Sequence, residues 1–172
     1  MFPLENVTSH WPYLVVAQQA GSNDNPRPLR FLECNHVPLG HRATCIDVDS
    51  NANLRQSAIE FANLDDIYRD PRVPRPGEPV IFGGPKYLIR FLGSLIRHVN
   101  ITDRESQLYK DDGNDGSGNY LECLPYNKGD HFILWIPRQD SYVGIEKFES
   151  GWYLTVSPLE NAARFYVIGQ QV

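Results

Sequence analysis

Hydrophobic and polar positions alternate in short runs along the chain, and glycine or proline interrupts most windows long enough for a helix. Short runs rich in aromatic and β-branched side chains, bounded by turn residues, are typical of β-strands. The chain has such runs at 11–18, 29–33, 44–48, 57–61, 79–82, 87–92, 96–101, 106–110, 120–124, 131–137, 141–148, 152–156 and 164–168. The best helix candidate is 54–62. The pattern therefore predicts an all-β barrel or sandwich of about twelve short strands.

A Tyr-Leu pair recurs along the second half of the chain, beginning at Tyr87, Tyr120 and Tyr153, with 33 residues between successive copies. The last two copies extend in register: Pro125, Phe132 and Leu134 follow the one, and Pro158, Phe165 and Val167 follow the other. A fixed spacing of this kind predicts one supersecondary unit copied around a pseudo-axis. The alternative is that tyrosine and leucine simply favour strands.

The last part of the chain carries a resemblance to a known fold. The segments 141–157 and 164–168 place a strand, a glycine turn, a Tyr-Leu strand and a Phe-centred strand in succession. This order resembles the closing unit of a β-trefoil. The sequence from Phe148 through Trp152 to Glu160 is similar to that of the last strands of the interleukin-1 family. The resemblance implies a single β-trefoil domain over residues 1–172, with a pseudo-threefold barrel.

A proline-rich segment would then form a long loop near residues 63–86. Proline occupies positions 71, 74, 76 and 79, and this density excludes a strand inside a sheet because each proline lacks a backbone donor. The segment is either a spacer that wraps the barrel or a stiff recognition loop that presents Arg72 and Arg75.

Composition narrows the classes of function. The 172 residues include 41% hydrophobic and 22% charged residues, as in ordinary globular domains. The 16 basic and 21 acidic residues give a net charge of −5, which argues against nucleic acid and membrane surfaces as partners. Three cysteines are too few for a disulfide framework, and the first residues do not resemble a signal peptide. We therefore expect a cytoplasmic protein.

Three candidate metal sites, one for zinc and two for calcium, have simpler explanations. Cys34, His36, His41 and Cys45 are zinc-ligand types within twelve residues, but their spacing is less typical of zinc than of a turn between strands. Residues 111–122 resemble a twelve-residue calcium loop without its flanking helices, and 47–53 is a second oxygen-rich run. Mobile connections between strands explain both, so the expected cofactor and metal content is none.

Catalytic and sugar-binding motifs are missing from the sequence. The five histidines and three cysteines lie in no recognisable nucleophile motif, and there is no Walker sequence, so we expect a protein that is not an enzyme. The Gln-x-Trp tripeptide of ricin-type lectins is also absent. Trp11, Trp135 and Trp152 lie in predicted strands, where core packing is expected.

Within the trefoil class, size and sparse cysteines are similar to the mycocypins, the mushroom protease inhibitors. The resemblance implies inhibition of a protease by loops that occlude its active site. Its binding loops map to 21–28 and to the proline-rich segment, with candidate contacts at Asn23, Asp24, Asn25, Arg27, Arg72 and Arg75. The alternatives are a lectin-like trefoil whose partner is a glycan, and a leaderless interleukin-1-like signalling ligand.

Overall fold

The computed structural model describes residues 2–33, 44–48, 58–63, 77–83, 87–91, 97–101, 109–110, 121–137, 140–149 and 151–170. Its strands are β1 (Tyr13–Gln18), β2 (Arg27–Glu33), β3 (Thr44–Val48), β4 (Ala58–Asn63), β5 (Tyr87–Phe91), β6 (Arg97–Ile101), β7 (Tyr109–Lys110), β8 (Leu121–Glu122), β9 (Leu124–Asn127), β10 (Phe132–Ile136), β11 (Ser141–Phe148), β12 (Gly151–Ser157) and β13 (Arg164–Gln170). Two 3₁₀ turns, η1 (Leu4–Asn6) and η4 (Leu159–Asn161), complete the described elements. The all-β class is confirmed.

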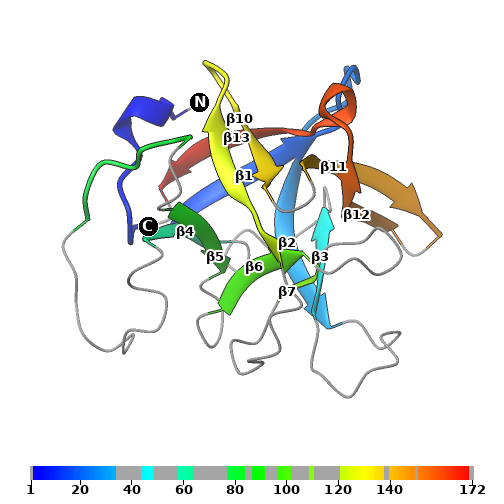
Figure 1. Ribbon diagram of the computed structural model, residues 1–172, viewed down its shortest axis with the longest axis horizontal. Coiled ribbons are helices and arrows are strands. Elements are labelled where there is room, and N and C mark those ends of the chain that lie inside the picture. Colours follow the sequence, from blue (N-terminus) through cyan, green and yellow to red (C-terminus); the bar gives the residue numbers. More distant parts are fainter. Residues whose placement is uncertain are drawn as a thin grey trace.

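The strands form one strongly curled antiparallel sheet (Figure 1). From β1, hydrogen-bonded pairing runs through β2, β3, β12, β11, β10 and β13 and returns to β1. A second path leaves β1 through β4, β5, β6 and β7 and rejoins the first at β3. The ladder thus closes on itself, while β8 and β9 each pair with one neighbour among the described strands.

Most predicted strands are present, with three differences. The helix candidate 54–62 is wrong over residues 58–62, because β4 occupies them and pairs with β1 and β5. Residues 79–82 make a single bridge, Thr8 to Pro79, and no strand. The run 131–137 matches β10, but the strand β9 at Leu124–Asn127 was not predicted beyond its first residue, where the run 120–124 ends.

Aromatic rings fill the middle of the curled sheet. Tyr13, Phe61, Phe132 and Phe165 are fully buried, and they come from β1, β4, β10 and β13. Phe132 lies 5.7 Å from Phe61 and 5.4 Å from Phe165, measured between ring centroids. Alternation along each strand directs these large side chains to one face, and their burial is the main stabilising contribution.

A strap of residues 77–83 crosses from the N-terminal segment to β9. The Ser9 amide donates to the Glu78 carbonyl at 2.8 Å, and the Val80 amide donates to the Val7 carbonyl at 3.0 Å. Its far end is fixed where the Gly83 amide donates to the Pro125 carbonyl at 2.8 Å. Phe82, in this strap, packs against the ring of Phe61. The strap is therefore part of the packed structure.

The 33-residue repeat does not mark copies of one structural unit. Tyr87 begins β5, whose paired neighbours are β4 and β6, whereas Tyr153 lies in β12, between β11 and β3. Tyr120 is outside the described residues. The spacing instead places Phe132 and Phe165 directly opposite each other on neighbouring strands. That interpretation of the repeat is wrong, although Phe132, Leu134, Phe165 and Val167 do belong to one core.

Candidate functional site

The turn between β1 and β2, residues 19–26, carries three of the predicted contact residues. Asn23, Asp24 and Asn25 are all exposed there. Arg27 was predicted in the same loop, but β2 begins at this residue, and it lies opposite Ala17 of β1. Arg72 and Arg75 lie outside the described residues. The structure thus places four of the six predicted residues at one end of the β1–β2 pair (Figure 1).

Hydrogen bonds hold this β1–β2 loop at several points. The Ser22 amide donates to the Gln19 carbonyl at 3.1 Å, closing a tight turn in which Gly21 has a φ of 74°. The Asp24 amide donates to the Ser22 hydroxyl at 3.0 Å. A positive φ is readily adopted by glycine and costs other residues energy, so Gly21 suits this turn.

Two further bonds join the loop to the strands beneath it. The Gln18 amide group donates through Nε2 to the Asp24 carbonyl at 2.6 Å. The Arg164 guanidinium donates through Nη2 to the Ser22 carbonyl at 3.1 Å. Gln18 ends β1 and Arg164 begins β13, and the two residues are opposite each other in the ladder. The loop is therefore connected to the curled sheet by side chains as well as by its own backbone.

The other end of the loop rests on an aromatic ring. The Arg27 guanidinium lies over the Trp152 ring, with Cζ 4.8 Å from the centroid. A cation over an aromatic face is attracted by the ring quadrupole. The hollow between the loop, Ile145 and Trp152 has a volume of about 10 Å³, which is room for about one water molecule. The loop thus packs closely onto β11 and β12.

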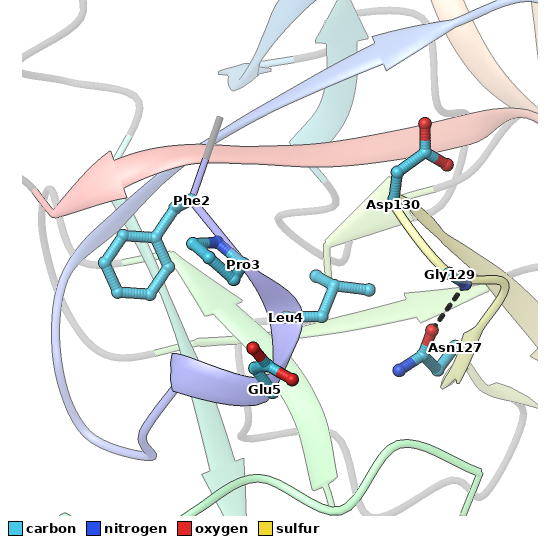
Figure 2. A pocket seen from close by; sticks show the side chains of 7 residues that line it. All are labelled: Phe2, Pro3, Leu4, Glu5, Asn127, Gly129 and Asp130. Carbon is cyan, nitrogen blue, oxygen red and sulfur yellow. Dashed lines mark hydrogen bonds between the residues drawn. The ribbon is translucent and has the colours of Figure 1, made fainter.

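A larger recess lies between η1 and the β9–β10 turn, with a volume of about 390 Å³. Figure 2 shows that the N-terminal segment supplies one wall and the turn supplies the other. Its lining combines apolar groups with carboxylates and an amide: Phe2, Pro3, Leu4, Glu5, Asn127, Gly129 and Asp130. Such a lining suits a side chain with an apolar stem and a positively charged end.

The turn that forms this recess is well defined. The Lys128 amide donates to the His131 carbonyl at 2.8 Å, and the Gly129 amide donates to Asn127 Oδ1 at 2.6 Å. Asp130 Oδ1 and His131 Nδ1 are 2.7 Å apart, and the hydrogen bond from His131 lowers the pKa of Asp130 below its ordinary value of 3.8. Asp130 is therefore ionised at neutral pH.

Sequence reasoning missed the side chains that hold the loop. Gln18 and Ser22 are ordinary residues for a strand end and a turn, and nothing in the sequence singles them out. Arg164 is 142 positions from Ser22, so only the folded chain brings them together. Trp11, expected in the core, is 48% exposed and precedes β1, whereas Trp152 is half-buried against the core.

The zinc candidates Cys34, His36 and His41 and most of the calcium candidate 111–122 lie outside the described residues, as do the side chains of Cys45 and Asp47. Within the described ranges, no group of three or more histidine, cysteine, aspartate or glutamate side chains is arranged to hold a metal ion. None of the described helices has the length and apolar character needed to cross a membrane.

Comparison with known proteins assigns the chain to no family. No protein-family model matches the chain, and no curated protein matches it. Its function must therefore be argued from its own geometry, which is that of an all-β protein with a braced, exposed loop.

Proposed function

We propose that the chain is a β-trefoil that inhibits a protease by placing the β1–β2 loop across the active-site cleft. The observation that carries this proposal is the bracing of an exposed polar loop by side chains of the barrel. A loop held in this way loses little conformational entropy when a partner binds it. On this proposal the chain binds a protease and catalyses nothing itself.

The strand pairing supports the trefoil part of the proposal. β1 pairs with β13, β2 and β4; β10 pairs with β9, β11 and β13; β5 pairs with β4 and β6 and lies beside β9. β1, β5 and β10 therefore have corresponding neighbours. One set of neighbours is β2, β6 and β11, in that order, and another is β4, β9 and β13. Three strands with equivalent neighbours are what a pseudo-threefold barrel requires.

Three antiparallel pairs extend this correspondence: β2 with β3, β6 with β7, and β11 with β12. β3 also pairs with both β7 and β12. One strand from each of the three pairs therefore lies near a common point. In this arrangement the β1–β2 loop and the β9–β10 turn lie at the same edge of the barrel, at the top of Figure 1.

The recess gives a protease a second place of contact on that edge. Leu4 provides a buried apolar wall, and Glu5 and Asp130 provide negative charge at exposed positions. A lysine or arginine side chain on the protease surface fits this combination, because its stem is apolar and its end is cationic. The loop would then occlude the cleft while the recess fixes the orientation.

The test is an inhibition assay of the whole chain against papain-like, legumain-like, trypsin-like and pepsin-like proteases. We expect inhibition of at least one class at micromolar concentration, lost when residues 22–25 are replaced by a Gly-Ser linker of equal length. Absence of inhibition in all four classes would contradict the proposal. Inhibition unaffected by the replacement would assign the activity to another loop.

A carbohydrate-binding function is the second candidate, and the exposed ring of Trp11 favours it. Trp11 is 48% exposed, so part of its surface is open to a sugar ring. Trp152 suits this role less well because Arg27 covers its face. Binding on a glycan array that is lost in Trp11→Ala, together with no protease inhibition, would favour this second function.

A further inference from the structure

The two contacts between the β1–β2 loop and the barrel flank a single residue. Arg164 Nη2 donates to the carbonyl of Ser22, and Gln18 Nε2 donates to the carbonyl of Asp24. Asn23 is therefore the one residue between two anchored carbonyls, and it is exposed. Its backbone is fixed on both sides while its side chain faces solvent or a partner.

Both anchors have a common base. Gln18 and Arg164 are opposite each other across β1 and β13, so the distance between the two donors is set by the ladder of the barrel. The Ser22 hydroxyl adds a third contact by accepting from the Asp24 amide, which joins the two anchored residues across Asn23. Motion of Asn23 relative to the barrel would require breaking these bonds.

The position of the Arg164 side chain points to the same role. Its Nε is buried and has no hydrogen-bond partner among the described residues. A buried guanidinium N–H without a partner is unfavourable, and such groups in native proteins call for an explanation. The bond to the Ser22 carbonyl is made by Nη2, so it fixes the direction of the side chain while Nε stays unpaired among the described residues.

We infer that Asn23 is the residue presented to the partner, and that Gln18 and Arg164 are positioning residues which fix its backbone. This inference rests on the proposed function, because it names the contact within the inhibitory loop. The Asn23 carboxamide both donates and accepts hydrogen bonds on a short stem. The partner subsite must therefore be small and must offer both a donor and an acceptor.

The contact role is tested in the protease that the inhibition panel identifies. Asn23→Ala should raise the inhibition constant about tenfold or more, as expected for a central contact residue. The matched control is Gln170→Ala, which truncates an exposed amide opposite Tyr13, at the other end of β1 from the loop, and should alter the constant by less than about threefold. Equal effects of the two substitutions would overturn the assignment of Asn23.

The positioning role is tested without any protease. The backbone order parameter of Asn23, measured by ¹⁵N relaxation, should be near 0.85 in the parent, about the value of rigid backbone. Gln18→Met and Arg164→Met, which preserve much of the length but remove the donor, should lower it below about 0.6. Arg164→Lys should restore much of the rigidity, because an ammonium group still donates to a carbonyl.

The contact role of Asn23 and the positioning role of Gln18 and Arg164 are overturned by different results. Unchanged order parameters in Gln18→Met and Arg164→Met would overturn the positioning role even if the parent is an inhibitor. If the parent inhibits no protease, the proposed function and the contact role of Asn23 fall together, and the order parameters still decide whether Gln18 and Arg164 fix the loop. A variant that loses native chemical-shift dispersion is replaced by Gln18→Leu or Arg164→Leu.

Discussion

Phe132 of β10 and Phe165 of β13 lie directly opposite each other, with ring centroids 5.4 Å apart and ring planes inclined by 19°. Both rings are fully buried. Phe165 is also opposite Ala17 of β1, so a small residue on one side leaves space for the large ring on the other. The pair joins β13 to β10 within the buried core.

Replacement of either ring should therefore be costly. We expect Phe132→Ala and Phe165→Ala each to lower the free energy of unfolding by about 3–5 kcal/mol, because burial is lost and a cavity remains. Urea denaturation measures this change. Ile168→Ala is the control on β13, and it should change the free energy by no more than about 0.5 kcal/mol because Ile168 is 48% exposed. A cost below about 1 kcal/mol for both phenylalanines would contradict the described packing.

Gly77 lies where the strap meets the residues before β1, and no other residue fits there without movement. A Cβ at this position would be 2.6 Å from the Ser9 carbonyl oxygen and 2.8 Å from Trp11 Nε1. We expect Gly77→Ala to destabilise the protein by about 1–3 kcal/mol through this overlap. Gly169→Ala is the matched control, since nothing lies within 4 Å of its Cβ. Equal melting temperatures for the two variants would show that the strap is not packed as described.

The buried Tyr13 hydroxyl connects β1 to the segment before it. It accepts from the Thr8 amide at 2.9 Å and lies 3.2 Å from Thr8 Oγ1. Tyr13→Phe leaves the ring in place and removes this acceptor, so we expect a loss of about 1–3 kcal/mol from the unpaired amide. Tyr126→Phe, at an exposed ring, should change the free energy of unfolding by less than about 0.5 kcal/mol. Equilibrium denaturation of both variants decides the comparison.

The Asp130–His131 pair predicts a pH dependence. The hydrogen bond from His131 makes the pKa of Asp130 lower in the folded chain than its ordinary value of 3.8. The resulting stabilisation is present above that value and is lost as pH falls through the lowered pKa. Asp130→Asn should therefore melt below the parent at pH 6, and the difference should shrink below pH 3.8.

An NMR titration gives an independent measurement of the same pair. The Asp130 carboxyl should titrate below 3.8 in the parent and closer to that value in His131→Phe, which removes the ring nitrogen. An unchanged titration midpoint in His131→Phe would assign the lowered pKa to another cause.

The strand pattern could be predicted to a large extent from the sequence, but the pairing could not. The runs 44–48 and 141–148 match β3 and β11 as predicted. The 57–61 run and the 54–62 helix candidate overlapped, and pairing with β1 and β5 decided in favour of β4. A short apolar run fits either structure until tertiary contacts supply a partner.

The candidate site was likewise predicted only in part from the sequence. Asn23, Asp24 and Asn25 were predicted from the resemblance to protease inhibitors that use loops near the start of the chain, and the structure places them in an exposed turn. Their anchors, Gln18 and Arg164, were not predicted, because the pairing of β1 with β13 joins the two ends of the chain.

By itself, the sequence determined the all-β class, the positions of most strands and the polar character of the β1–β2 loop, because alternation and turn residues act over a few neighbouring positions. Only the tertiary structure decided that Phe132 faces Phe165, that Arg164 holds Ser22, and that the segment beginning at Phe2 forms a recess with the β9–β10 turn. These contacts join residues far apart in the chain. They exist because the curled sheet closes, and closure depends on all its strands together.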